Sequence, residues 1–380
     1  MRIAHIGLAV PYTEGMTYQD NFLVKQNVQD GHETLYIAQA AKFVNGKIVE
    51  TGYEDTVIEG GAHLIRVPYV HVVNKFVSEK IRKVKGLYDI LDEFEPDVIL
   101  SHDLAYYSVL EVIKYKKTHM NVKLYADTHT DDKNSGRNWL SIHILHRVFY
   151  KYLTQKTLKY LEKYLNICPA SRKFSMENYG VPKELMMFWP LGAKIFSEEE
   201  FREKREKKRK ELDLQANELL LIHSGKLDKL KKTEDLLRAF KKVESLYAKL
   251  VIIGSIGEEV QKDINELINM DKRVVFLGWK SGEELLDYLC ACDLYCQPGS
   301  SSATLQNAVG CFCPVLCYPE EIYVTLDKGN FIWAKNEEDI VSALEKIESG
   351  NIRIADMTMH AKECALEFLD YSKIVQTLYK

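Results

Sequence analysis

Two patterns of hydrophobic and polar positions alternate along the whole chain. Short runs rich in β-branched residues predict buried strands, and the longer amphipathic stretches between them predict helices. This alternation predicts an α/β protein whose parallel sheets are covered by helices on both faces. In the first half of the chain the predicted strands are Ile3–Gly7, Thr34–Ala38, His63–Val67, Val98–His102, Lys123–Thr128 and Asn166–Pro169.

A second series of strands follows and indicates a second sheet. Its predicted members are Leu219–Gly225, Leu250–Gly254, Val274–Gly278, Leu294–Pro298, Val315–Tyr318 and Phe331–Ala334. Between the two series, a proline and a glycine at residues 189–193 interrupt regular structure. A chain of 380 residues is also longer than one hydrophobic core usually supports. We therefore expect one domain over residues 1–192, a second over residues 193–360, and a helix over residues 361–380 that could pack back on the first domain.

The composition is that of an ordinary globular protein, with 46% hydrophobic residues, 28% charged residues and a formal net charge of −4. This charge does not indicate nucleic-acid binding. The apolar run Met1–Val10 lacks the basic leader and the cleavage site of a signal peptide. No apolar stretch reaches the ~18–20 residues that a membrane-spanning helix requires. We therefore expect a cytoplasmic protein.

Eight cysteines without a secretion signal favour reduced thiols. Six of them form two similarly spaced groups, Cys290, Cys292 and Cys296, and then Cys311, Cys313 and Cys317. A metal cluster is conceivable, but no CxxC pair or histidine partner is nearby. We expect these thiols to pack in the core, and we expect no metal and no other cofactor.

Two segments in the second half carry the residue types that bind a diphosphate. The strand ending at Gly225 runs into Lys226, Lys231 and Lys232 just before a predicted helix, and such lysines are point cations for phosphate. The second segment leaves a strand, turns through small residues and enters a helix, whose free N–H groups favour an anion. Its donor-binding candidates are Ser300, Ser301, Ser302, Ala303, Thr304, Gln306 and Asn307. A surface lysine cluster and a plain N-cap are the alternative interpretations.

Polar residues also follow two strands of the first half. His129 ends one strand and could be a general base, a donor to a sugar or a structural histidine. His102 and Asp103 end the neighbouring strand. The loop after the first strand contains Gly15, Thr17 and Tyr18 and could lie on the acceptor side, although a simple strand-to-helix connection has the same composition. This loop has no GxGxxG pattern, which argues against nicotinamide binding.

These motifs resemble the retaining glycosyltransferases of family 4, which have the GT-B fold of two Rossmann-like domains with parallel sheets facing a central cleft. The resemblance covers nearly the whole chain and rests on Gly31-His32-Glu33, Pro96-Asp97-Val98-Ile99 with His102-Asp103, Gly180-Val181-Pro182, Pro190-Leu191-Gly192 and Ser224-Gly225-Lys226-Leu227-Asp228 with Lys231. It implies a nucleotide-sugar donor held by the C-terminal domain and a glycan or lipid-linked acceptor on the N-terminal side. It also implies that His129 contacts the transferred sugar, that Lys226 and Lys231 act on the departing diphosphate, and that no metal is needed.

The chain departs from the family pattern at several of these positions. Lys226 replaces the usual arginine, which removes a bidentate fork, and Lys232 replaces the usual glycine. Asn307 stands where the family has the second of two glutamates, and the first falls on Gly299 or is deleted. The resemblance implies transfer of a sugar in surface polysaccharide or glycoconjugate synthesis. Because the two glutamates are missing, a catalytically silent binding partner is the alternative interpretation. An epimerase on the same fold is a third.

Two basic segments have open interpretations. In residues 201–212, glutamates are interspersed among the lysines and arginines, which favours a solvated helix over a binding patch. In residues 133–164, basic and aromatic residues together could lie on an anionic membrane surface, or on the solvent face of an ordinary amphipathic helix. The residues of the second segment concerned are Arg137, Trp139, Arg147, Phe149, Tyr150, Lys151, Tyr152, Lys156, Lys159, Tyr160, Lys163 and Tyr164.

Overall fold

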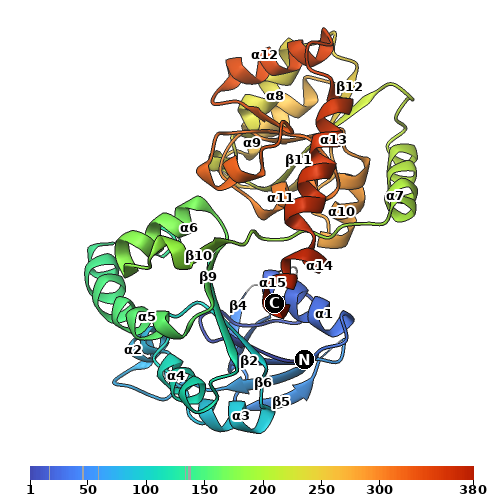
Figure 1. Cartoon of the computed structure of the whole chain (residues 1–380). Coiled ribbons are helices and arrows are strands. Elements are labelled where there is room, and N and C mark those ends of the chain that lie inside the picture. The colour runs from blue at the N-terminus through green and yellow to red at the C-terminus, as the bar shows by residue number, and fades with distance from the viewer. Residues whose placement is uncertain (17, 45–46, 59, 133, 136–137) are drawn as a thin grey trace. The chain divides into compact units, whose positions relative to one another are not determined.

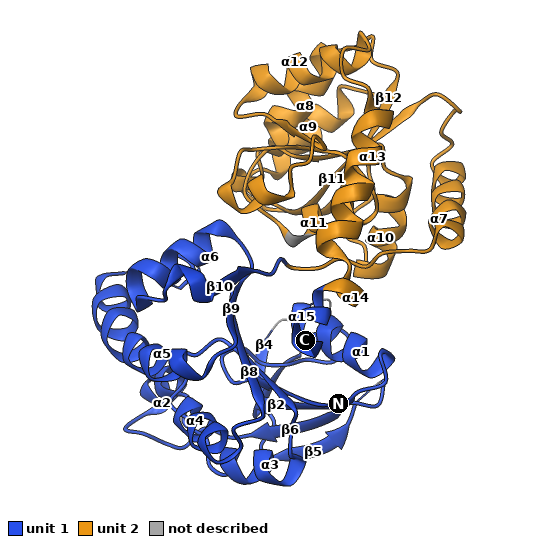
Figure 2. Cartoon of the chain, viewed as in Figure 1, with its two compact units in different colours: residues 1–190, 374–380 blue, residues 191–373 orange. Residues whose placement is uncertain are grey.

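The computed structural model describes residues 1–380 except residues 17, 45–46, 59, 133 and 136–137 and the side chain of residue 303. The chain divides into two compact units (Figure 2). Unit 1 comprises residues 1–190 and 374–380, and unit 2 comprises residues 191–373. The expected first domain ended at residue 192. Of the segment 361–380, which we expected to return to that domain, only residues 374–380 belong to unit 1, because the preceding helix packs on unit 2.

Unit 1 contains a sheet whose strand order is β10-β9-β8-β7-β1-β2-β6-β5. All its neighbouring strands are parallel except the edge pair β5 and β6. The strands of this sheet are β1 Arg2–Gly7, β2 Glu33–Gln39, β5 Glu54–Val57, β6 His63–Val67, β7 Val98–His102, β8 Lys123–Thr128, β9 Lys163–Asn166 and β10 Met186–Phe188. A separate antiparallel hairpin consists of β3 Ala41–Val44 and β4 Lys47–Glu50.

Helices cover both faces of the unit 1 sheet. Figure 1 shows α1 and α15 on one side, and α2, α4 and α5 on the other. The helical elements are α1 Gln19–Gln29, α2 Lys75–Ile81, α3 Leu87–Phe94, α4 Val109–Thr118, η1 Ser141–Tyr150, α5 Lys151–Thr157, η2 Leu158–Tyr160, α6 Pro169–Phe174, η3 Ser175–Tyr179, η4 Lys183–Leu185 and α15 Gln376–Tyr379. The core between them is built from fully buried aliphatic residues such as Ile6, Ile99 and Leu124.

Unit 2 contains a six-stranded parallel sheet in the order β13-β12-β11-β14-β15-β16. Its strands are β11 Leu219–Leu227, β12 Ala248–Ile256, β13 Val274–Phe276, β14 Leu294–Gln297, β15 Val315–Cys317 and β16 Phe331–Trp333. Numbered within the unit, this order is 3-2-1-4-5-6, which defines a Rossmann-like sheet with its switch point between β11 and β14. In such sheets, ligands bind beyond the carboxyl ends of the strands at the switch point.

The helical elements of unit 2 follow the expected alternation with strands. They are α7 Glu198–Glu211, η5 Lys229–Lys231, α8 Thr233–Lys242, α9 Gln261–Asn269, α10 Gly282–Ala291, α11 Ala303–Gly310, η6 Glu321–Leu326, α12 Glu337–Glu348, α13 Ile354–Cys364, η7 Ala365–Leu369 and α14 Tyr371–Ile374. Helix α12 packs against α8, whereas α10 packs against α7 and α11. The sheet is therefore covered by helices on both faces, as the sequence pattern predicts.

The prediction of a strand over Asn166–Pro169 was wrong in position. Strand β9 ends at Asn166, and Pro169 is the first residue of helix α6. The thiol of Cys168 accepts a hydrogen bond from the backbone N–H of Ser171 and caps this helix. A proline at the first helical position is favourable because it has no N–H to leave unpaired. The pattern also missed β5 and β10 and the exposed hairpin of β3 and β4, because short edge strands carry little hydrophobic signal.

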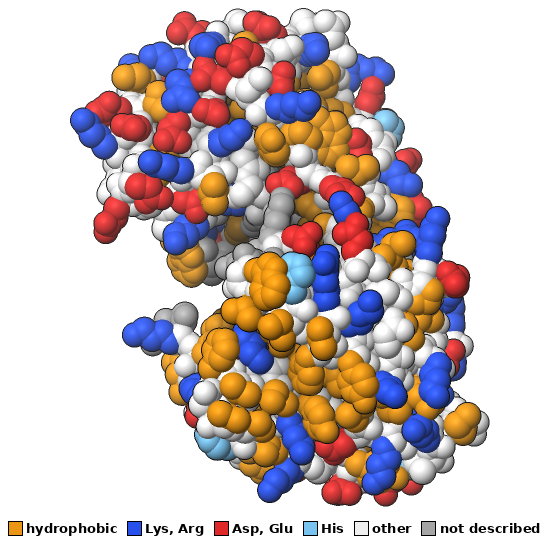
Figure 3. All heavy atoms as spheres, turned by 90° about the vertical axis from the view of Figure 1, so that its left-hand side faces the viewer, with side chains coloured by type: hydrophobic (Ala, Val, Ile, Leu, Met, Phe, Trp, Pro, Cys, Tyr) orange, Lys and Arg blue, Asp and Glu red, His pale blue; other side chains and the backbone are white. Residues whose placement is uncertain are grey.

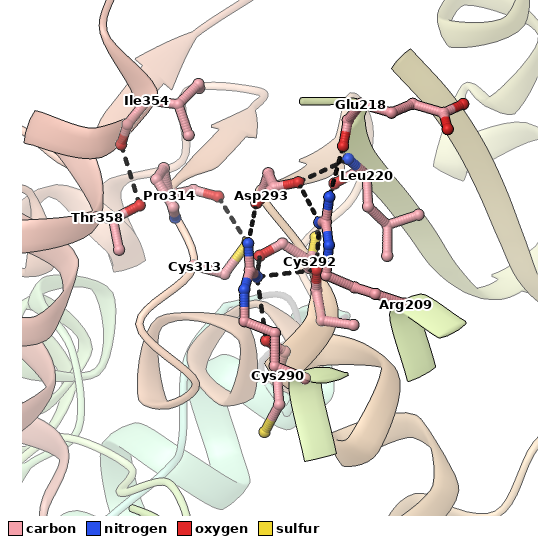
Figure 4. Close-up of polar contacts among 12 residues, drawn as sticks. Arg209, Glu218, Leu220, Cys290, Cys292, Asp293, Cys313, Pro314, Ile354 and Thr358 are labelled. Carbon is pink, nitrogen blue, oxygen red and sulfur yellow. Dashed lines mark hydrogen bonds and ion pairs between the residues drawn. The ribbon is translucent and has the colours of Figure 1, made fainter. Parts of the chain in front are cut away.

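The interpretation of residues 201–212 as a solvated helix was partly wrong. Helix α7 forms there, but two of its arginines hold the end of α10 (Figure 4). Arg205 donates hydrogen bonds to the backbone oxygens of Cys290, Ala291 and Cys292, and it pairs with Asp293. Arg209 also pairs with Asp293, at 2.8 Å. Cationic groups stabilise the last carbonyls of a helix.

All eight cysteines are free thiols and are buried. Burial raises the pKa of the Cys296 thiol well above its usual range. The first cysteines of the two groups are in contact: Cys290 on α10 and Cys311 at the end of α11 have their sulfur atoms 3.7 Å apart. Neutral thiols in this environment pack as small apolar side chains.

Candidate functional site

The two predicted diphosphate-binding segments meet at the switch point of unit 2. The first follows β11 and forms the short helix η5, and the second follows β14 and enters α11. The backbone N–H of Ser300 donates to the carbonyl oxygen of Leu230 over 2.8 Å. Parallel strands explain this meeting, because β11 and β14 are neighbours and end at the same edge of the sheet.

Lys231 is the cation at the centre of this contact. Its ammonium donates hydrogen bonds to the backbone oxygens of Ser300 and Ser301, over 3.0 Å and 3.3 Å. The residue is only 9% exposed, and burial lowers the pKa of this lysine, although the nearby Asp228 opposes that effect. Within the described residues, no carboxylate lies within ion-pairing distance of the ammonium. A buried ammonium without an anionic partner is costly, so the site favours an anion.

Three glycines let the backbone of this site approach closely. A Cβ added at Gly299 would lie 2.0 Å from the Leu230 carbonyl oxygen, which leaves no room for a side chain. Gly225 has a φ of 139°, and a Cβ added at the neighbouring Gly254 would lie 1.8 Å from the Gly225 carbonyl oxygen. Only glycine suits such positions.

The start of α11 combines a conventional cap with two uncommitted serines. The Ser302 hydroxyl accepts from the Thr304 backbone N–H and is the N-cap. The hydroxyl of Tyr323 accepts from the backbone N–H of Ser302 and donates to its carbonyl oxygen. The hydroxyls of Ser300 and Ser301 have no hydrogen-bond partner among the described residues. The plain N-cap interpretation therefore explains one serine of three.

The remaining predicted residues of unit 2 differ in their surroundings. Lys226 is exposed, and no described side chain binds its ammonium. Lys232 lies over the ring of Tyr318, with its Nζ 4.8 Å from the ring centre, and it has a left-handed φ of 53°. Gln306 is buried and Asn307 is half-buried on α11, and Ala303 is the first residue of that helix.

Sequence reasoning missed the buried residues that support this site. His223 on β11 donates through Nδ1 to the Cys296 carbonyl oxygen and accepts from the Thr233 hydroxyl at Nε2. Burial lowers the pKa of His223 to about 4, so the ring is neutral. Gln297 on β14 donates through its amide to the backbone oxygen of Ser300. A polar residue within an otherwise apolar strand was the available signal in both cases.

In unit 1, the predicted polar residues meet at the ends of β7 and β8. His102 donates through Nδ1 to the Asp127 carboxylate over 2.7 Å. Asp103 accepts from the Thr130 hydroxyl over 3.1 Å and has a left-handed φ of 72°. His129 is half-buried, and its backbone oxygen accepts from the side-chain amide of Asn134.

Buried charges fix the protonation of this cluster. Burial alone would lower the pKa of His102, but the carboxylates of Asp20 and Asp127 outweigh it and raise this pKa to about 9. Burial would raise the pKa of Asp127, but His102 and then His129 outweigh it and lower that pKa. His102 and Asp127 therefore form an ion pair at neutral pH. Asp127 and Asp20 were not predicted as site residues, although Asp127 lies in the predicted strand Lys123–Thr128, two residues before His129.

The predicted acceptor-side loop precedes α1. Gly15 has a φ of 73° and is exposed, and Tyr18 is exposed and is the N-cap residue of α1. Thr17, the third predicted residue of this loop, lies outside the described residues. An exposed glycine and an exposed aromatic side chain on a loop can adapt to a ligand. The contacts of Gly15 and Tyr18 described here assign them no other role.

Comparison with known proteins gives a family match within unit 2. Residues 204–363 match the model of the family described as glycosyl transferases group 1. Alpha-galactosylglucosyldiacylglycerol synthase of Streptococcus pneumoniae is 23% identical over 168 residues, which are 42% of this chain and 44% of that protein. An uncharacterized glycosyltransferase of Methanocaldococcus jannaschii is 26% identical over 216 residues, 52% of this chain and 49% of that protein. The chain spans about half the length of the curated relatives it matches.

Several solved structures share the fold over the full length of the chain. Anabaena HepE in complex with UDP has a TM-score of 0.68 at 14% identity, covering 100% of this chain and 98% of that one. Sucrose-phosphate synthase from Thermosynechococcus elongatus has a TM-score of 0.67 at 13% identity, with 100% and 97% covered. WaaG, a glycosyltransferase involved in lipopolysaccharide biosynthesis, has a TM-score of 0.61 at 15% identity, with 100% and 99% covered.

The fold is therefore GT-B, with two Rossmann-like units, as the sequence motifs predict. Residues 204–363, which form most of unit 2, match the group 1 glycosyltransferases. The GT-B fold implied by the resemblance is confirmed, and the match over unit 2 agrees with a glycosyltransferase, whereas family 4 and retention stay predictions.

Proposed function

We propose that the chain is a retaining glycosyltransferase that takes a sugar from a nucleotide-sugar donor. The acceptor would be a glycan, a glycolipid or a protein-linked glycan in surface polysaccharide or glycoconjugate synthesis. The family match over unit 2 supports the transferase class. The likeness to HepE, whose structure holds UDP, supports a nucleotide donor. The relative from Streptococcus pneumoniae, a glycolipid synthase by name, supports a lipid-linked acceptor.

The buried ammonium of Lys231, which has no carboxylate partner among the described residues, carries this proposal. When a glycosidic bond to a diphosphate breaks, negative charge grows on the leaving diphosphate, and a cation fixed beforehand stabilises that charge most. Lys231 is held in place by the backbone oxygens of Ser300 and Ser301 and needs no rearrangement to meet an anion. The exposed Lys226 would add charge from the end of the same strand. With lysines supplying the positive charge, we expect transfer to continue in the presence of EDTA.

His129, His102 and Asp103 would serve the sugar and the acceptor in this proposal. The imidazole of His129 is half-buried and retains ring nitrogens for hydroxyl groups. Among the described residues, no hydrogen bond or ion pair occupies its ring. Gly15, Thr17 and Tyr18 would contribute a loop on the acceptor side.

Substitution of Lys231 tests the donor site directly. Lys231→Ala should weaken binding of UDP and UDP-glucose by about 10- to 100-fold, because a hydrogen bond to a charged group contributes ~1.5–3 kcal/mol. Lys229→Ala is the matched control, because Lys229 is an exposed lysine on the same short helix. Isothermal titration calorimetry measures both. Equal affinity in the Lys231→Ala protein and the wild type would reject the proposed site.

A catalytically silent binding protein is the second candidate, and Gly299 favours it. The backbone leaves no space for a glutamate side chain at this position. The half-buried Asn307 offers only a neutral amide to a donor. The two functions differ in turnover, because a silent protein would bind UDP-glucose without releasing UDP. Release of UDP that Lys231→Ala and His129→Ala abolish would establish the transferase.

We also propose that one face of unit 1 lies on an anionic lipid surface. Leu140, Ile144, Val148 and Tyr152 are 64%, 51%, 63% and 52% exposed. Positions four residues apart lie on one side of a helix, so these side chains form a continuous stripe along η1 and α5. Trp139 extends it. No helix within the described residues is long and apolar enough to cross a bilayer.

Basic residues border this apolar stripe. Arg147, Lys151 and Lys156 are exposed on the same helices, and the ammonium of Lys156 lies over the ring of Tyr152. Figure 3 faces the side on which α5 and α6 lie in Figure 1, and it shows hydrophobic side chains gathered on unit 1 with Lys and Arg around them. Apolar side chains flanked by lysine and arginine are suited to the headgroup region of anionic lipids. Such a surface would bring a lipid-linked acceptor to the protein.

A further inference from the structure

A chain of buried hydrogen bonds starts at the ion pair of unit 1. Beyond Asp127, the Nε2 atom of His102 lies 3.1 Å from the Nδ1 atom of His5 on β1. The Nε2 atom of His5 lies 2.7 Å from the side-chain oxygen of Asn27 on α1. His5 and Asn27 are fully buried. Neither His5 nor Asn27 has a part in the proposed transfer.

The same chain continues to the surface through the last helix. The side-chain amide of Asn27 donates to the hydroxyl of Tyr379 over 2.9 Å. That hydroxyl donates to the carboxylate of Asp30 over 2.7 Å. Tyr379 also packs its ring edge-on against His32, with ring centres 4.4 Å apart. Helix α15 is thus bound to α1 through a residue that also ends a buried network.

The direction of every hydrogen bond in this chain follows from Asp30, the carboxylate at its outer end. Asp30 can only accept, so the Tyr379 hydroxyl donates to it and accepts from the amide of Asn27. The oxygen of Asn27 then faces His5 and accepts from its Nε2–H. His5 therefore has a bare Nδ1, which can only accept from His102.

We propose that Tyr379 is a positioning residue for His102. Through Asn27 and His5, its hydroxyl fixes which ring nitrogens of His102 carry protons, and it thereby sets the charge at the carboxyl edge of the unit 1 sheet. A role for that charge in transfer rests on the proposed function. The control of the charge by Tyr379 does not.

Without the Tyr379 hydroxyl the chain can reverse. The amide of Asn27 is then free to turn its NH2 group toward His5, which moves the proton of His5 from Nε2 to Nδ1. A proton at His5 Nδ1 faces the proton at His102 Nε2, so the doubly protonated form of His102 loses its partner. His102 then accepts at Nε2 and becomes neutral.

The other groups around His102 do not replace this control. Asp127 on β8 and Asp20 on α1 favour its charged form, and His5 on β1 opposes a charge on both rings. Tyr36 on β2 stacks on the ring and donates its hydroxyl to Asp20 over 2.6 Å. None of these side chains bonds to His102 Nε2 except His5, so the chain through Asn27 acts on that nitrogen alone.

Histidine titration followed by NMR tests the inference in the full-length protein without donor or acceptor. The 11 histidines are labelled with ¹⁵N, and His102→Gln identifies the signal of His102. In Tyr379→Phe the pKa of His102 should fall by about one unit or more, since a hydrogen bond to a charged group is lost. Asp30→Ala should lower it too, because the Tyr379 hydroxyl is then free to donate to a reversed Asn27. Asp30 is exposed, so this second variant leaves the core intact.

Two control variants separate this effect from general ones. Tyr53→Phe removes a hydroxyl from an exposed tyrosine of unit 1, and Asp89→Ala removes a surface carboxylate from α3. Both should leave the titration of His102 unchanged. The inference is overturned if Tyr379→Phe and Asp30→Ala leave the pKa of His102 where it is in the wild type, or if the controls lower it equally. A failure of the protein to bind UDP in a separate assay would contradict the proposed function but not the control of the His102 pKa by Tyr379.

Discussion

Gly299 packs directly against the backbone of Lys231: a Cβ added at position 299 would lie 2.6 Å from the Lys231 carbonyl carbon. This contact joins the two segments that hold the proposed diphosphate site. We expect Gly299→Ala to separate them and to cost about 1–3 kcal/mol of stability, as extra atoms do in a close-packed site. The same variant should weaken UDP binding, because Lys231 moves away from Ser300. Thermal unfolding and calorimetric titration measure the two effects.

Gly257→Ala is the matched control for this prediction. Its added Cβ would meet only the flexible end of the Glu259 side chain, which can move away. This variant should therefore unfold and bind UDP as the wild type does. Equal behaviour of the two alanine variants would show that the Gly299 contact does not organise the site.

Lys232 occupies a conformation that suits glycine. Its φ of 53° lies in the left-handed region, which costs a residue with a Cβ about 1–2 kcal/mol. We expect Lys232→Gly to be more stable than Lys232→Ala by about 1 kcal/mol, which raises the melting temperature of unit 2 by roughly 2–4 °C. Lys229 lies in the helix η5 with ordinary helical geometry, so glycine should be the less stable of the same two substitutions there. The same order at both positions would contradict this explanation.

The sequence predicts much of this fold because its strands are short, apolar and regularly spaced. All six predicted strands of unit 2 are present, within two residues of their expected ends. The meeting of Lys231 with the serine-rich segment also follows, since both follow neighbouring parallel strands. Residue type and strand order are sufficient for these features.

Partners that are distant in the sequence could not be predicted in this way. Asn27 and Tyr379 are separated by 352 positions, and Arg209 and Asp293 by 84. Each of these residues is of a type that is common in its helix or strand end. The sequence around it therefore does not indicate which residue it binds. The left-handed φ of Lys232 was visible only as a lysine in place of the family's glycine.

The stability of unit 1 should depend on pH through His102. The raised pKa of about 9 lies above the value near 6.5 expected in the unfolded chain. The resulting stabilisation is fully present below about pH 6.5 and is lost as the pH rises through about 9. A shift of this size corresponds to on the order of 3 kcal/mol. Urea unfolding between pH 6.5 and 9.5 should show the loss, and His102→Gln should remove most of the slope.

His5 acts in the opposite pH range. Burial, and then the charge on His102, lower its pKa to about 4. Its contribution is present above about pH 6.5 and is lost as the pH falls toward 4. The exposed His71 provides the control, because His71→Gln should leave both limbs of the profile unchanged. An alkaline limb that is identical in His102→Gln and the wild type would refute the assignment of the charge to His102.

Binding to vesicles should depend on the apolar stripe of η1 and α5. Burying a large apolar side chain contributes about 1.5–3 kcal/mol, so a charge placed within the stripe should remove most of the affinity. We expect the wild type to float with vesicles containing phosphatidylglycerol, and Ile144→Asp and Val148→Asp to remain at the bottom of the gradient. Added salt should weaken flotation, because Lys151 and Lys156 act through exposed charge.

A control variant and a change of lipid composition distinguish specific binding to anionic membranes from non-specific hydrophobic adsorption. Val57 on β5 is 72% exposed, compared with 63% for Val148, so Val57→Asp removes at least as much apolar surface from unit 1 without changing η1 or α5. This variant should float as the wild type does, because Val57 lies outside the stripe and its basic border. Flotation with uncharged phosphatidylcholine vesicles should be weaker, because the border then has no anionic headgroups to bind. If Val148→Asp and Val57→Asp float equally well, the stripe is an ordinary solvent face, and a lipid-linked acceptor would have to reach unit 1 by another surface.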